Sequence, residues 1–209
     1  MYFFSVHDEG HLFSTNKISF CIEMINMVTA SGQHSALPLS EFTEKLRVEY
    51  YESIGRLCAD VRDQVDKIKR IDATGMNHGY LQQCQSVLDK ITSALNERRE
   101  RFVPYLVSLA DKVASDHNCT NCSGGCKLNH DVHLFDLSAA IKALKTTQSD
   151  LQLLSLPLYG ETLFPDQYRV LRNLLALIES DIVELFFLEK NYLIPKVTEA
   201  QKAINVFGR

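Results

Sequence analysis

The sequence predicts an all-α protein, and three observations favour an antiparallel four-helix bundle. Four long segments carry apolar residues at three- and four-residue intervals, the period of an amphipathic helix. Short or moderate loops connect these segments, which favours antiparallel neighbours. Their apolar stripes are wider than a strict a/d seam, as in a globular bundle rather than a coiled coil.

The first two predicted helices are bounded by recognisable start and stop residues. The first begins after Ser40, a good N-cap, and ends near Ile71, before Gly75. The second covers about residues 77–115. Pro104 lies inside it, and because proline lacks an amide donor we expect a kink or a restart there.

Two further helices are predicted in the second half of the chain. The third begins near His130 or Asp131 and extends past Leu151. The fourth starts at Pro165, because a proline is favoured at the first helical position. Pro195 is expected to kink this last helix, after which the apolar pattern resumes.

The apolar stripes are interpreted as core positions. In the first two helices they are Phe42, Leu46, Tyr50, Ile54, Leu57, Val61, Val65, Leu81, Cys84, Val87, Leu88, Ile91 and Leu95. In the last two they are Leu134, Leu137, Ala140, Ile141, Leu144, Leu151, Val170, Leu171, Leu174, Leu175, Ile178, Ile182, Leu185 and Phe186, continuing through Val197, Ala200 and Ile204.

The N-terminal residues differ in pattern from the rest and predict a separate extension. A short hairpin is expected over residues 2–14, and a short helix after it that ends at Gly32. We therefore divide the chain into an extension, 1–38, and a helical bundle, 39–209, with a Cys/His-rich loop between the second and third helices of the bundle.

Composition excludes several classes of function. The 209 residues carry a formal charge of −4, so no basic surface indicates nucleic-acid binding. The N-terminus lacks the pattern of a secretory signal, and no run of about 18 apolar residues predicts a membrane span. The expected location is therefore cytoplasmic, where thiols stay reduced and clustered cysteines favour metal or redox chemistry over disulfides.

The strongest functional signal is a loop with three cysteines and three histidines within residues 117–133. Sulfur and imidazole ligands at such short spacing are suited to one metal centre, because the chain between them needs only to turn. The glycines at 124 and 125 permit positive φ angles and let backbone amides approach sulfur. The candidate ligands are Cys119, Cys122, Cys126, His117, His130 and His133.

The sequence does not decide which metal centre this loop binds. Zinc would take the three cysteines and one histidine as its fourth ligand. A [4Fe–4S] cluster would take the three cysteines together with a histidine, a distant cysteine or solvent. A third interpretation is a loop of unligated thiols. His130 and His133 are three residues apart and would share one face of a helix. The same segment is also typical of a helix start capped by Asn129 or Asp131.

Charged residues elsewhere are interpreted mainly as surface. The run from Glu97 to Arg101 has mixed charges, which is typical of a solvated face. The fourth helix carries Glu179, Asp181, Glu184 and Glu189, which we also interpret as surface charge. A carboxylate site inside the bundle is the alternative, although no Glu-x-x-His of a di-iron bundle occurs.

Residues 189–195, Glu-Lys-Asn-Tyr-Leu-Ile-Pro, resemble the Glu-Glu-x-x-Leu-Phe-Pro ending of the last helix in hemerythrin-like proteins. In that family a four-helix bundle holds two irons through histidines and carboxylates and binds or senses oxygen. The resemblance implies an up-down bundle. The iron-ligand pattern departs from the family: Leu185 stands where a histidine is expected, and no His-x-x-x-Glu occurs. Glu189 is therefore carried over as a position only.

Three functions follow from these patterns. The leading hypothesis is a cytoplasmic metal- or iron–sulfur-binding helical protein with a redox, sensory or accessory role. The alternative is a non-catalytic helical interaction module with a structural zinc loop, which binds a protein partner or a second copy of itself. An enzyme with a carboxylate site inside the bundle is the third. We expect neither a nucleic acid nor a membrane as partner.

Overall fold

The computed structural model describes residues 34–72, 75, 77–122, 134–155 and 165–204. Across these ranges the chain forms helices and no strand. Its contacts divide it into two units, Met1–Leu37 and Pro38–Arg209, and the second is described here by itself. The hairpin predicted over residues 2–14 and the helix predicted after it lie outside the described residues.

The first predicted helix is present as one continuous helical run. It consists of α2 (Leu39–Lys45), a π-helical segment η1 (Leu46–Tyr51) and α3 (Glu52–Ile71). Its end near Ile71 is confirmed, but the predicted cap at Ser40 is wrong. The N-cap is Pro38, whose carbonyl accepts the Phe42 amide at 2.9 Å, and no side chain caps this end. Proline starts a helix well because its φ is already set.

The second and fourth predicted helices each change from α to π and back. The second consists of α4 (His78–Glu97), η2 (Arg98–Phe102) and α5 (Val103–Ala114). The fourth consists of α7 (Pro165–Leu188), η6 (Glu189–Leu193) and α8 (Ile194–Ala203). Between them lie a short 3₁₀ turn, η3 (Cys119–Asn121), and α6 (Leu134–Ser155). The start of the third helix predicted near His130 or Asp131 lies outside the described residues.

The interruptions predicted at Pro104 and Pro195 are confirmed, and the π segments explain how the helices accommodate them. Each proline is near the start of an α-helix that directly follows a π segment. The Val103 amide bonds to the Arg98 carbonyl and the Ile194 amide to the Glu189 carbonyl, the wider π spacing. A proline has no amide donor and crowds the preceding turn, so a wider turn just before it relieves both problems.

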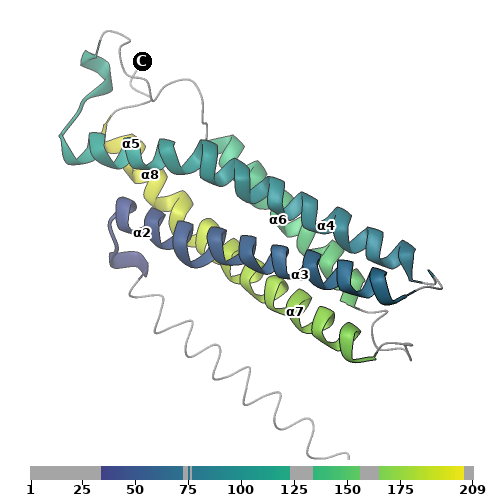
Figure 1. Ribbon diagram of the computed structural model, residues 1–209. Coiled ribbons are helices and arrows are strands. Elements are labelled where there is room, and N and C mark those ends of the chain that lie inside the picture. Colours follow the sequence, from purple (N-terminus) through teal and green to yellow (C-terminus); the bar gives the residue numbers. More distant parts are fainter. Residues whose placement is uncertain (1–33, 73–74, 76, 123–133, 156–164, 205–209) are drawn as a thin grey trace, which may run out of the picture. The chain divides into compact units, whose positions relative to one another are not determined.

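Four of the long helices contact one another in a closed set of pairs. α3 contacts α4 and α7, and α6 contacts the same two helices; Figure 1 shows these four elements side by side. In the hydrogen bonds between α3 and α4, the residue number in α4 falls as the residue number in α3 rises. Arg62 bonds to Asp89 and Lys69 to Gln85 between α3 and α4. None of the described helices is both long and apolar enough to cross a membrane.

The predicted apolar stripes form the core, with few exceptions. In α4 all six predicted positions are buried. Val170 is an error, because 45% of its surface is exposed on α7. Leu57, Leu174 and Phe186 are only partly buried.

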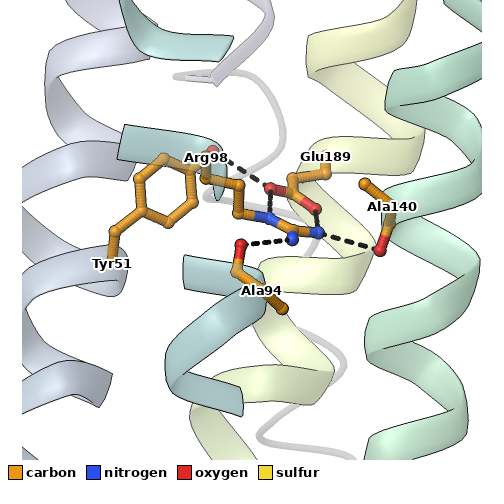
Figure 2. A network of polar contacts seen from close by, with 5 residues as sticks. All are labelled: Tyr51, Ala94, Arg98, Ala140 and Glu189. Carbon is orange, nitrogen blue, oxygen red and sulfur yellow. Dashed lines mark hydrogen bonds and ion pairs between the residues drawn. The ribbon is translucent and has the colours of Figure 1, made fainter. Parts of the chain in front are cut away.

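A buried ion pair lies where the three π segments meet. Arg98 donates from Nε to Glu189 Oε1 at 2.7 Å and from Nη2 to Oε2 at 2.9 Å, and both side chains are 0% exposed. Figure 2 shows the guanidinium held at the same time by the carbonyls of Ala94 and Ala140, at 3.0 and 3.2 Å. Tyr51 donates its hydroxyl to Glu189 Oε1 at 3.0 Å. The solvated face predicted for Glu97–Arg101 is therefore wrong at Arg98.

The electrostatics of this network keep the guanidinium of Arg98 charged. Burial alone lowers the pKa of Arg98, but the Glu189 charge and its hydrogen bonds outweigh burial and raise that pKa above its ordinary value. Burial, and then the Glu189 charge, raise the pKa of Tyr51 well above its ordinary value. The core therefore contains a charged guanidinium and a neutral phenol, and both are hydrogen-bonded to Glu189.

Removing one charge of this pair should destabilise the fold strongly. We expect Arg98→Met to lower the free energy of unfolding by about 3–5 kcal/mol, because Glu189 then stays buried without a counter-charge. Chemical denaturation followed by circular dichroism measures this. The double variant Arg98→Met/Glu189→Met should recover part of the loss.

The matched control is Arg99→Met in the same π segment, because Arg99 is exposed. We expect it to change the stability by no more than about 0.5 kcal/mol. Equal, small losses for the two variants would contradict a buried ion pair.

Candidate metal centre

The C-terminus of α5 turns the chain sharply and places His117 beside the helix end. The Asp116 amide bonds to the Val113 carbonyl at 3.1 Å and the His117 amide to the Lys112 carbonyl at 3.0 Å. These two bonds define a Schellman motif, whose turning residue adopts a left-handed conformation. Asp116 has that conformation, with φ 51°. Aspartate is among the few residues other than glycine that tolerate it well.

The next residues form the 3₁₀ turn η3, which brings two cysteines to one side. Asn118 caps this turn: its Oδ1 accepts the Thr120 amide at 3.0 Å and the Thr120 hydroxyl at 2.7 Å. In a 3₁₀ helix with three residues per turn, positions i and i+3 eclipse one another. Cys119 and Cys122 have this spacing, and the Cys122 thiol donates to the Cys119 carbonyl at 3.2 Å.

These two turns gather three of the predicted ligands. The metal-binding atoms of His117, Cys119 and Cys122 all lie within 4.8 Å of one another, and each residue is half-buried. His117 Nε2 is buried and has no hydrogen-bond partner in the described structure. A buried imidazole nitrogen needs a partner, and coordination of a metal ion through Nε2 would provide one.

The donor set and the spacing fit a borderline-soft metal ion. Zinc binds cysteine sulfur at about 2.3 Å and histidine nitrogen at about 2.0–2.1 Å, so tetrahedral ligand atoms lie roughly 3.6–3.8 Å apart. Adjustments of about 1 Å would close the observed group around one ion. The other three predicted ligands, Cys126, His130 and His133, lie outside the described residues.

The site is attached to the C-terminal end of α8. The Cys119 amide bonds to the Ile204 carbonyl at 2.9 Å. Nearby, Gln201 Nε2 donates to the Tyr105 hydroxyl at 2.5 Å, which joins α8 to α5. Burial raises the pKa of Tyr105, and the hydrogen bond with Gln201 offsets only part of this increase. Sequence reasoning missed the α8 contacts, because no local pattern indicates which distant carbonyl meets a loop amide.

Sequence reasoning also missed the pairing of Arg98 with Glu189. One signal was available: the two residues lie at the same distance before Pro104 and Pro195. Each begins a π segment, and together they form the only buried ion pair with fully covered side chains in the described part of the chain. Glu189 accepts three hydrogen bonds there, which leaves little capacity for a metal ion.

Comparison with protein-family models, with curated proteins and with solved structures finds no match to this chain. No family model therefore supports the resemblance to hemerythrin-like proteins. The structure shares only its helical character with that family, in the residues that it describes. Leu185, at the position where a histidine is expected, is buried in the core.

The other two described cysteines have a different environment from the loop cysteines. Cys58 and Cys84 are 0% exposed in the core. Burial raises the pKa of each thiol to about 11. Both are therefore protonated core residues. Cys21 lies outside the described residues.

These shifted thiols predict a loss of stability at alkaline pH. Their pKa is raised in the fold from 9.0 to about 11, so the unfolded chain loses these protons first. Their stabilising contribution is complete below pH 9 and disappears as the pH approaches 11. We expect the free energy of unfolding to fall by roughly 2–3 kcal/mol per thiol across that window. Urea titrations at a series of pH values measure this.

The variant Cys58→Ala/Cys84→Ala distinguishes the contribution of the two thiols to this pH dependence from that of other titratable groups. It should lose less stability between pH 9 and pH 10 than the native chain. Tyrosines with raised pKa values, such as Tyr51, add to the loss only above their ordinary value of 10.0. The same slope in both proteins below pH 10 would show that the thiols are not the cause.

Proposed function

We propose that this chain is a helical metal-binding protein whose Cys/His loop holds one metal ion, with His117, Cys119 and Cys122 among the ligands. The proposal rests mainly on the convergence of one imidazole nitrogen and two sulfurs within 4.8 Å. The unpartnered buried Nε2 of His117 supports it independently. The fourth ligand is expected from Cys126, His130 or His133.

Zinc is the metal that this arrangement favours. A mixed set of nitrogen and sulfur donors is ordinary for Zn²⁺, which has no geometric preference beyond four-coordination. A [4Fe–4S] cluster is the second candidate, because a third cysteine follows at Cys126. Inclusion of His117 in the group favours zinc, since iron–sulfur clusters are held mainly by thiolates.

The architecture that we propose is an antiparallel four-helix bundle. Between the α4–η2 run and α6, Lys90 bonds to Asp150 and Arg98 to Ala140, so residue numbers fall on one helix as they rise on the other. Between the η1–α3 run and the α7–η6 run, Gln64 bonds to Gln167 and Tyr51 to Glu189 in the same opposite order. The likeness to hemerythrin-like proteins is limited in this proposal to the bundle plan.

The biological role that we propose is redox, sensory or accessory. The loop joins the end of α5 to the end of α8, so a bound ion would stabilise the packing of those two helices. Reduced thiolate ligands require a reducing compartment, which supports a cytoplasmic location. A protein partner or a second copy of the chain is part of the proposal, and exposed Leu153 and Leu177 support it.

The direct test is metal content and thermal stability. We expect anaerobically purified protein to contain one zinc per chain by elemental analysis and to be colourless. Zinc at about 100 times its Kd stabilises a protein by about 2.7 kcal/mol, so removal by a chelator should lower Tm by roughly 5–10 °C. Brown protein with iron and sulfide would instead support the cluster.

Variants assign the ligands. His117→Ala and Cys122→Ser should each reduce the zinc content well below one per chain, and both should remove the effect of the chelator on Tm. Asn121→Ala, exposed in the same turn, is the matched control and should keep its zinc. An unaltered melt after confirmed metal removal would refute a stabilising ion. Full zinc content in both ligand variants would refute the site.

A further inference from the structure

The 3₁₀ turn that gathers the ligands also gives two cysteines the geometry of a disulfide. A 3₁₀ helix rises about 2.0 Å per residue, so Cys119 and Cys122 have Cα atoms roughly 6 Å apart on one side. Disulfides join Cα atoms roughly 4.4–6.8 Å apart. The same local structure that directs two thiolates to an ion therefore permits their oxidation to a bond without unfolding of the loop.

Among the described cysteines, Cys119 and Cys122 are the two whose thiols a solvent oxidant can reach. Cys119 and Cys122 are half-exposed, whereas Cys58 and Cys84 are completely buried. Peroxides react with accessible thiolates, and cysteines bound to zinc are thiolates. The core thiols are inaccessible, and their raised pKa keeps them protonated.

We propose that Cys119 and Cys122 form a peroxide-sensitive switch, in which their oxidation to a disulfide releases the metal ion. The inference rests on the proposed function, because it assigns the regulation of the same site. Its oxidant is hydrogen peroxide or an organic hydroperoxide. Each sulfur that enters the disulfide loses the lone pair with which it bound the ion as a thiolate, so His117 and the fourth ligand cannot retain zinc alone.

The chemistry balances in two displacements. One thiolate attacks a peroxide oxygen: an S–O bond forms, the O–O bond breaks, and the hydroxide that leaves takes up a proton to become water. The second thiolate attacks the resulting sulfenic sulfur: an S–S bond forms, the S–O bond breaks, and a second hydroxide is protonated to water. Two thiolates, one peroxide and two protons give one disulfide and two waters, with the sulfurs oxidised and the peroxide reduced.

Oxidation of the loop should affect α8 first. The Cys119 amide is hydrogen-bonded to the Ile204 carbonyl at the end of α8, so rearrangement of the loop acts directly on that bond. In a zinc shell the two sulfurs are about 3.8 Å apart, and in a disulfide about 2.05 Å. We expect the Cys119 amide to lose protection against hydrogen exchange when the loop is oxidised.

The test treats the zinc-loaded full-length chain with one equivalent of hydrogen peroxide. A chromogenic zinc chelator measures the release, and peptide mapping by mass spectrometry locates the disulfide. We expect up to one zinc per chain to be released together with a Cys119–Cys122 disulfide, and rebinding after addition of dithiothreitol and zinc. Asn121→Ala, the matched control, should respond like the native chain.

The outcomes separate this inference from the proposed function. Zinc that binds but is not released, or is released with a disulfide to Cys126 instead, overturns the switch and leaves the metal site intact. A chain that binds no zinc refutes the proposed function, and the switch with it. The peptide map uses the native protein, so the test does not depend on whether a Cys119→Ser variant folds.

Discussion

The ion pair between Arg98 and Glu189 links two helical runs inside the core. Both side chains are completely removed from solvent, so separating them would leave two uncompensated charges in the core. The carbonyls of Ala94 and Ala140 and the hydroxyl of Tyr51 complete the hydrogen bonding. A rotation or a one-residue slip of any of these helices would break the network, so the pair specifies how the helical runs register against one another.

This constraint extends to the candidate metal centre through the two helices that follow it. Arg98 and Glu189 begin the π segments that precede Pro104 and Pro195, and α5 and α8 continue from there. α5 contacts α8, and both are seen at the same end of Figure 1. The Schellman turn after α5 then presents His117, and the Ile204 carbonyl at the end of α8 holds the Cys119 amide. The loop that carries these ligands is thus attached both to the end of α5 and to the end of α8.

The features that sequence reasoning recovered are local ones. Helical extents, the two proline interruptions and most core positions follow from periodicity and from the missing amide of proline, which act within a few residues. The Cys/His loop was recognised by residue type and spacing, and His117, Cys119 and Cys122 do converge. The burial of Arg98 was missed because a charge inside a charged run looks solvated until its partner is known, and Glu189 is distant in the chain. The side chain of Ser40 is typical of a cap, but the backbone of Pro38 starts the helix.

We propose that nitrogen and sulfur ligands from a single loop hold one ion. X-ray absorption spectroscopy at the zinc edge of the reconstituted chain tests it most directly. We predict a four-coordinate shell with at least two sulfurs at about 2.3 Å and at least one nitrogen at about 2.0–2.1 Å. A shell of oxygen and nitrogen alone, or a shell of sulfur without nitrogen, would contradict this set of ligands.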